Sequence, residues 1–152
     1  MKAYPTQHIR NVVLLGSTKS GKTTLSEAML YEGKVIDRRG TVEAKNTVSD
    51  NAEIEQINQR SIYATPLYAE FMDTKFNIID TPGADDFVGG AVSAFKVCDT
   101  GVLVVNAQQG VEVGSQQQSS EYHTLLHSEN KSVFRPLLPA VHLLRALPGR
   151  KL

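Results

Sequence analysis

A glycine-rich stretch at residues 16–23 constrains the fold of this chain more than any other feature. Its pattern is a glycine, four variable residues, and a second glycine followed by lysine and threonine. Two glycines let the backbone curl so that its N–H groups point at phosphate oxygens, and the start of the next helix adds partial positive charge. A glycine-bearing turn can match this pattern by accident. The apolar run before the stretch and the amphipathic helix after it favour a phosphate-binding loop, or P-loop.

The side chains of this loop indicate how a nucleotide would be held. Lys22 is expected to reach the β- and γ-phosphates, and the Thr23 hydroxyl is expected to ligate Mg²⁺. The residues predicted to bind the nucleotide in and beside the loop are Gly16, Ser17, Thr18, Lys19, Ser20, Gly21, Lys22, Thr23 and Thr24.

A second short motif lies further along the chain, where Asp80, Thr81, Pro82 and Gly83 follow an apolar run. In a nucleotide-binding protein an aspartate here holds Mg²⁺, usually through water, and the glycine N–H bonds the γ-phosphate. The same four residues also suit an ordinary turn, because proline and glycine favour one. Their combination with the P-loop favours the nucleotide role and adds Asp80 and Gly83 to the predicted site.

The expected secondary structure alternates between strands and helices. In chain order it comprises a strand at 12–15, a helix at 23–32, a long polar connection at 34–64, strands at 67–72 and 76–79 joined by a turn at 73–74, a helix at 87–97 and a strand at 101–106. This order predicts an α/β domain with a mostly parallel sheet flanked by helices on both faces. The long connection is expected to be a mobile functional loop, because compact domains seldom keep one without a role.

Composition narrows the class of protein. The chain has 152 residues, 41% of them hydrophobic, and zero net charge, so a globular domain is expected, with neither a membrane nor DNA as a partner. Its single cysteine, Cys98, excludes an internal disulfide and is expected to be a buried packing residue. The polar N-terminus lacks the apolar core of a signal peptide, which predicts a cytoplasmic location.

Three separated motifs, in order and spacing, resemble the N-terminal part of the GTP-binding domain of elongation factor G and related translation GTPases. They are residues 16–24, residues 80–83 followed by 86–89, and residues 99–114. The resemblance covers about residues 8–118. It implies a P-loop NTPase fold, GTP as ligand or substrate, Mg²⁺ as cofactor, and the ribosome as the partner of complete relatives.

The resemblance extends into the long connection. Ser49 and Asp50, with the acidic residues after them, are similar to the family's first switch segment, which places Ser61 where the family carries a Mg²⁺-ligating threonine. The metal set implied is therefore Thr23, Ser61 and Asp80. A solvated serine is the alternative, because residues 58–60 depart from the family's Arg-Gly-Ile.

Three departures from the family bear on mechanism. Ala84 stands where the family has its water-orienting histidine, so slow hydrolysis is expected and no catalytic residue is assigned, although Asp85 or Asp86 could substitute. Lys19 replaces an aspartate, which removes a possible monovalent-cation ligand. The guanine-reading motif Asn-Lys-x-Asp is absent, because Asn130 and the lysine after it are not followed by an aspartate.

The C-terminal part changes in character. A partial P-loop GTPase domain is expected over residues 1–118 and an irregular tail over residues 119–152, with a third helix at about 115–127 and a short one at 141–147. The last strands and helices of a complete domain would then be missing, which suggests a truncated or shifted reading frame. The alternatives to a GTP-binding domain are a P-loop ATPase or kinase, and a non-catalytic fragment.

Overall fold

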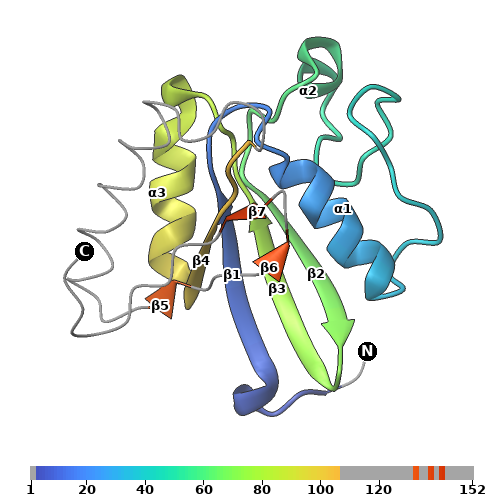
Figure 1. Ribbon diagram of the computed structural model, residues 1–152, viewed down its shortest axis with the longest axis vertical. Helices are drawn as coiled ribbons and strands as arrows, with labels where there is room; N and C mark the ends of the chain where they lie inside the picture. The colour runs from blue at the N-terminus through green and yellow to red at the C-terminus, as the bar shows by residue number, and fades with distance from the viewer. Residues whose placement is uncertain (1–2, 107–131, 134–136, 139–140, 143–152) are drawn as a thin grey trace.

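The fold is built on a mixed sheet with strand order β2-β3-β1-β4-β5 (Figure 1). The structure, a computed structural model, describes residues 3–106, 132–133, 137–138 and 141–142. The central strand β1 (Ile9–Leu15) pairs in parallel with β3 (Thr74–Asp80) and with β4 (Thr100–Leu103). The edge strand β2 (Thr65–Phe71) pairs antiparallel with β3. The prediction of a mostly parallel α/β sheet is confirmed.

Helices α1 (Lys22–Glu32) and α3 (Val88–Val97) cover opposite faces of this sheet. Successive side chains of a strand point to opposite faces, and β1 supplies apolar residues to both. Val13 and Leu15 pack in one cluster with Phe95 of α3, whereas Val12 and Leu14 pack in the other, against which α1 lies. Such burial on both faces explains the continuous apolar run of β1.

Cys98 belongs to the cluster under α3 and is 3% exposed, which confirms its expected packing role. A 3-10 helix (Asp85–Phe87) precedes α3, so the predicted helix at 87–97 begins irregularly. Among the described residues, no helix combines the length and the apolar character needed to cross a membrane.

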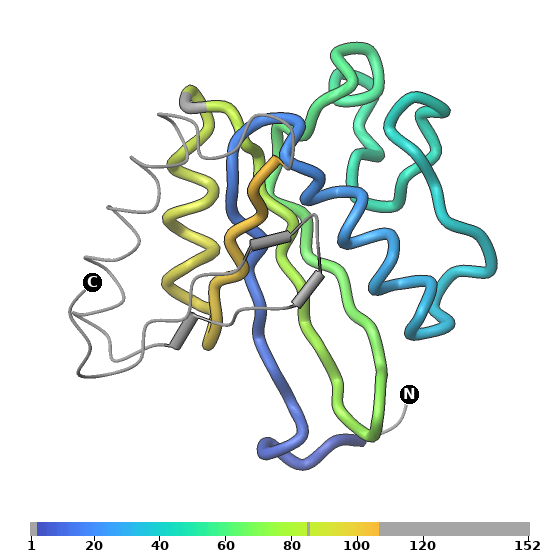
Figure 2. The backbone as a smooth tube through the Cα atoms, viewed as in Figure 1, coloured from blue at the N-terminus to red at the C-terminus, as the bar shows by residue number. Residues whose placement is uncertain are grey.

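The long connection between α1 and β2 runs beside and beyond α1 (Figure 2). It contains a short helix, α2 (Glu53–Asn58), which was not predicted from the sequence. Six residues carry too little periodicity to reveal a helix, so the connection was predicted as a loop without one. The turn after β2 also lies one residue earlier than predicted. It is formed by Met72 and Asp73, which have positive φ angles of 46° and 57°.

Part of the C-terminal region continues the sheet. Strand β5 (Ser132–Val133) pairs in parallel with β4, and β6 (Leu137–Leu138) pairs antiparallel with β7 (Val141–His142). The prediction of a short helix at 141–147 is therefore wrong at residues 141–142, which form β7. The helix expected at 115–127, and the boundary between residues 118 and 119, lie outside the described residues.

Candidate nucleotide-binding site

The loop at residues 16–21 joins the carboxyl end of β1 to the start of α1, and its backbone needs both glycines. Gly16 has φ 140°, and a Cβ there would collide with the carbonyl oxygen of Val104. Gly21 has φ 101° but open space around it, so conformation alone demands glycine at that position. Lys19 also adopts a left-handed conformation, and its carbonyl accepts a hydrogen bond from Asn106 Nδ2 at 3.2 Å.

Lys22, the first residue of α1, folds back over this loop. Its Nζ donates hydrogen bonds to the carbonyl oxygens of Gly16 at 2.8 Å and Ser17 at 2.9 Å, and the residue is 5% exposed. Burial lowers the pKa of Lys22 to about 8, against the opposing effects of Asp80 and Asp50. An ammonium held in this way is available to an anion that enters the loop.

Asp80 ends β3 directly beside the loop, because β3 and β1 are parallel and Asp80 is in register with Leu14. The residue is fully buried, and its Oδ2 accepts a 3.3 Å hydrogen bond from Ser26 of α1. Burial raises the pKa of Asp80, although the hydroxyls of Ser49 and Thr23 oppose the shift. Its Oδ1 has no hydrogen-bond partner, which leaves a buried carboxylate oxygen for a ligand.

Gly83 brings the second motif against the first. A Cβ on Gly83 would collide with Lys22 Nζ and would lie 2.6 Å from both the carbonyl carbon of Ser17 and the amide nitrogen of Thr18. These two loop atoms are backbone, so they cannot swing away as a flexible side chain would. Only glycine fits at this position, and the two predicted motifs lie in one place.

The hydroxyl groups of Thr23 and Ser61 meet across the site. Thr23 Oγ1 and Ser61 Oγ lie 3.2 Å apart, although 38 residues separate them in sequence. These two hydroxyls and the unpartnered Oδ1 of Asp80 are all oxygen ligands, the kind that Mg²⁺ prefers. In nucleotide sites Mg²⁺ usually takes only a few ligands from the protein and the others from phosphate and water. The described residues contain no cluster of three or more His, Cys, Asp or Glu that would suit a protein-only metal cage.

Asp50 lines the same cavity, although no ligand role was predicted for it from the sequence. It is 4% exposed, and both of its carboxylate oxygens lack a hydrogen-bond partner. Burial raises the pKa of Asp50 to about 6, which the nearby Ser61 hydroxyl opposes and the charge of Asp80 reinforces. The resemblance to the family's first switch segment includes Asp50 but does not indicate that its side chain is buried beside the P-loop. Only the folding of the connection onto the site does so.

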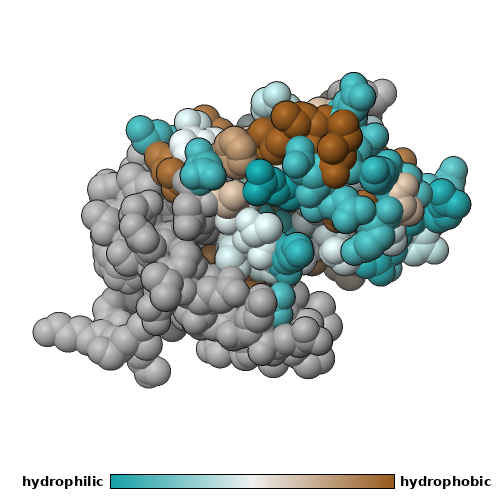
Figure 3. Space-filling view, turned by 90° about the horizontal axis from the view of Figure 1, so that it is seen from above, coloured by the Kyte–Doolittle hydropathy of each residue, from teal (hydrophilic) through white to brown (hydrophobic). Residues whose placement is uncertain are grey.

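A cavity of about 410 Å³ opens between the P-loop and the connection, within the range of small-molecule sites. The predicted residues that line it are Thr18, Lys19, Gly21, Lys22, Thr23, Thr24, Ser61 and Gly83. The opposite wall comes from Val42, Glu43, Asp50, Asn58, Gln59 and Arg60. The end of the molecule where α2 lies faces the viewer in Figure 3, where hydrophilic residues predominate and hydrophobic ones gather in a patch.

Four predicted residues do not line this cavity. Gly16, Ser17 and Ser20 form the body of the loop, and Asp80 is buried beside it. The hydroxyls of Ser17 and Ser20 are buried and have no hydrogen-bond partner.

Ala84 follows Gly83 and is partly buried, with its carbonyl accepting the N–H of Phe87 at 3.0 Å. A methyl group can neither donate nor accept a hydrogen bond, so the side chain of Ala84 has no means to orient a water molecule. Asp86, which could have substituted, is exposed.

Comparison with known proteins agrees with this geometry. A family model described as the elongation factor Tu GTP-binding domain matches residues 7–134. The chain belongs to this family. The matched range extends beyond residue 118, where the partial domain was expected to end. That boundary stays a prediction.

Within the elongation factor Tu GTP-binding domain family, the resemblance to elongation factor G is confirmed. An elongation factor G-like protein of Mycobacterium tuberculosis is 40% identical over 68% of this chain and 15% of its own length. Elongation factor G of Dehalococcoides mccartyi is 33% identical over 80% of this chain and 18% of its own length. A crystal structure of a protein from Thermus thermophilus has a TM-score of 0.74 and 33% identity, covering 78% of this chain and 18% of that one. The chain thus spans less than a fifth of the length of each of these three proteins.

Proposed function

We propose that this chain binds GTP together with Mg²⁺ in the cavity between the P-loop and the connection. The backbone of residues 16–24 and the Lys22 ammonium would hold the phosphates, and the Gly83 N–H would meet the γ-phosphate. Thr23, Ser61 and Asp80 would hold Mg²⁺, which supplies positive charge against the phosphate oxygens when bound. The observation that carries this proposal is the 3.2 Å approach of the Thr23 and Ser61 hydroxyls beside the unpartnered Oδ1 of Asp80.

The proposal includes a switch. Residues 34–65 and 80–90 would order around GTP and relax after its hydrolysis, because both segments contribute to the cavity or its floor. In complete relatives, of which elongation factor G is one, we propose that such a domain acts on the ribosome in the cytoplasm. We further propose that residues 1–118 form the partial domain and that residues 119–152 are a tail outside it.

Hydrolysis of GTP is expected to be slow. Positioning of the attacking water supplies a large part of the rate in this chemistry, and Ala84 cannot provide it. The methyl side chain of Ala84 therefore favours a second candidate function, a nucleotide-sensing module without catalytic turnover. A hydrolysis rate clearly above background, with or without ribosomes, would exclude that second function.

A competition titration tests the proposed function. A fluorescent GDP or GTP analogue is titrated onto the 152-residue chain with Mg²⁺, and unlabelled GTP or ATP is added as competitor. Displacement by GTP at far lower concentration than ATP supports the proposal, whereas equal competition would favour an ATPase or kinase.

A pair of lysine variants controls this titration. Lys22→Ala is expected to weaken binding by about tenfold or more, because it removes a buried cation beside the phosphates. Lys34→Ala, at a surface position just beyond α1, should leave it unchanged. No binding by the wild-type chain, or equal binding by both variants, would overturn the proposed function.

A further inference from the structure

Two glutamates are almost completely buried outside the residues assigned to phosphate and Mg²⁺. Glu27 lies on α1 and Glu55 on α2, and each is 1% exposed. A carboxylate is seldom buried unless it is paired or hydrogen-bonded, because it loses its hydration. The partners of both glutamates are therefore informative, and they are backbone N–H groups of the connection.

Glu27 closes the first part of the connection into a compact loop. Its Oε2 accepts the N–H of Gly40 at 2.8 Å, and its Oε1 accepts the N–H of Val48 at 2.6 Å. One side chain thus ties both ends of residues 40–48 to α1. The loop is also closed internally, since Asn46 Oδ1 accepts the N–H of Thr41 at 2.9 Å.

Glu55 closes the second part in the same way. Its Oε2 accepts the N–H of Ala52 at 3.2 Å, at the start of α2. Its Oε1 accepts the N–H groups of Ile62 at 2.9 Å and Tyr63 at 3.0 Å, which directly follow Ser61. These hydrogen bonds hold the segment that follows α2 against the helix. Ser61 lies within this segment, directly before Ile62.

We propose that Glu27 and Glu55 are positioning residues that hold residues 40–63 against the nucleotide cavity, with Glu55 setting the Ser61 hydroxyl against Thr23. The wall residues of the cavity from Val42 to Ser61 all lie between the outermost tied amides, those of Gly40 and Tyr63. Hydrogen bonds to a carboxylate are stronger than those between neutral groups, so these five bonds can limit the motion of the segment while no ligand is bound, and GTP would order it further. The inference rests on the proposed function for the meaning of the Ser61 position, but the clamp itself can be tested without nucleotide.

Amide hydrogen exchange on the nucleotide-free 152-residue chain tests the clamp. Glu27→Gln should speed exchange at Gly40 and Val48 by about tenfold and leave Ile62 and Tyr63 unchanged. Glu55→Gln should do the reverse, so each variant is the matched control of the other. Glu32→Gln, an exposed glutamate on α1, should change neither pair.

Two outcomes of the exchange experiment would overturn the clamp. Unchanged exchange at the tied amides would show that the carboxylates do not hold them. Faster exchange throughout β1 and β3 would show that the glutamates support the whole fold rather than the segment. Glu27→Asp and Glu55→Asp, which keep the charge but shorten the reach, give the same test if a glutamine variant does not fold.

The role of Glu55 toward Ser61 is tested through the Mg²⁺ dependence of GTP-analogue binding. Mg²⁺ raises the affinity for the GTP analogue, and Glu55→Gln should reduce this gain about as much as Ser61→Ala does. The double variant should show the same gain from Mg²⁺ as Ser61→Ala alone. Additive losses would overturn the positioning role. If the wild-type chain binds no nucleotide, the proposed function fails, while the exchange data still decide whether the clamp exists.

Discussion

Thr23 Oγ1 and Ser61 Oγ lie 3.2 Å apart, one at the start of α1 and the other just after α2. Two hydroxyl oxygens at this distance can share one cation, with Asp80 buried at the same place. The contact therefore joins the P-loop to the connection, and changes on either side should be felt by the same ligand.

Ser61→Ala is expected to lower the gain in GTP-analogue affinity produced by Mg²⁺ by about tenfold, because one oxygen ligand is lost. Ser61→Thr keeps the hydroxyl and should retain most of the gain. The measurement is a fluorescence titration with Mg²⁺ and with a chelator. Equal behaviour of Ser61→Ala and the wild type in both titrations would contradict the metal role.

Nucleotide affinity is expected to fall as the pH rises above about 8, because burial lowers the pKa of Lys22 to about 8. Above that pKa the free protein must take up a proton to present an ammonium to the phosphates, so affinity should fall by up to about tenfold per pH unit. Lys22→Arg stays charged and should show a flat profile over the same range. A wild-type profile as flat as that of Lys22→Arg would contradict the assignment.

Gly83→Ala is expected to destabilise the protein by about 1–3 kcal/mol and to impair nucleotide binding, because the new Cβ would lie 2.6 Å from loop backbone atoms. Gly89→Ala is the matched control. It places the same methyl group on α3, where nothing lies within 4 Å, and should stabilise the protein by about 0.5–1 kcal/mol. Urea unfolding measures both, and equal effects would be inconsistent with the close approach.

Asp50→Asn is expected to stabilise the Mg²⁺-free protein near neutral pH by about 1–2 kcal/mol, because burial raises the pKa of Asp50 to about 6. A raised carboxyl pKa means that the folded state takes up a proton as the pH falls through about 6, and stability rises. The advantage of Asp50→Asn over the wild type should therefore shrink toward about pH 5. Unfolding at both pH values without Mg²⁺ tests this, and a constant or reversed difference would contradict it.

Ala84→His is expected to raise the GTP hydrolysis rate by about tenfold or more, because it introduces a group able to orient and polarise water beside Gly83. The measurement is phosphate release under single-turnover conditions, with binding measured in parallel. Ala84→Leu adds bulk without a polar atom and should not raise the rate. Acceleration by both variants would show that water positioning is not the reason.

The features of the fold that follow from local patterns were predicted well. The P-loop can be read from glycine spacing, and β1 from an apolar run ending at Gly16, because these features depend on neighbours in the sequence. Ser61 was placed through resemblance and not from spacing. Its contact with Thr23 depends on how the connection folds back, which no local pattern encodes.

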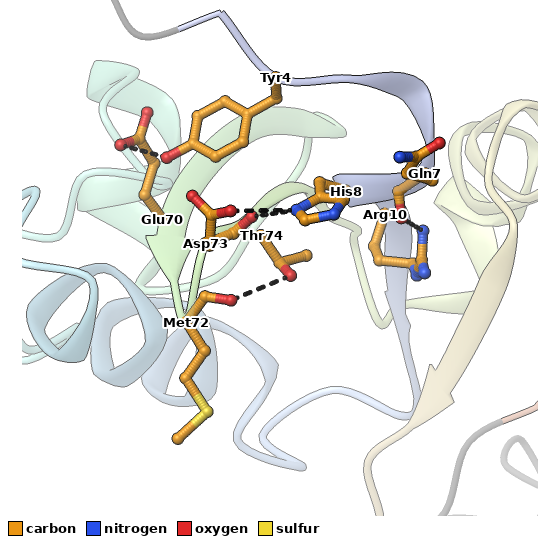
Figure 4. A network of polar contacts seen from close by, with 8 residues as sticks. All are labelled: Tyr4, Gln7, His8, Arg10, Glu70, Met72, Asp73 and Thr74. Atoms are coloured by element: carbon orange, nitrogen blue, oxygen red, sulfur yellow. Dashed lines mark hydrogen bonds and ion pairs between the residues drawn. The ribbon is translucent and has the colours of Figure 1, made fainter.

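Contacts between distant segments were harder to predict. The N-terminal segment is closed onto the β2–β3 hairpin by Tyr4, whose hydroxyl donates to Glu70 Oε2 at 2.9 Å, and by His8, whose Nδ1 lies 2.8 Å from the carbonyl oxygen of Asp73 (Figure 4). These partners lie 66 and 65 residues apart. No periodicity marks them, because the pairing of β1 with β3 is what brings these distant residues together.

The sequence by itself determined the P-loop motif and the alternation of strands and helices, because each depends on residue identity and short-range spacing. The family resemblance singled out Ala84. Only the tertiary structure decided that Asp50 lines the same cavity as the P-loop and that Glu27 and Glu55 accept hydrogen bonds from the connection. The reason is physical: a buried carboxylate is defined by the N–H groups and charges around it, and these come from segments brought together by the sheet and its helices.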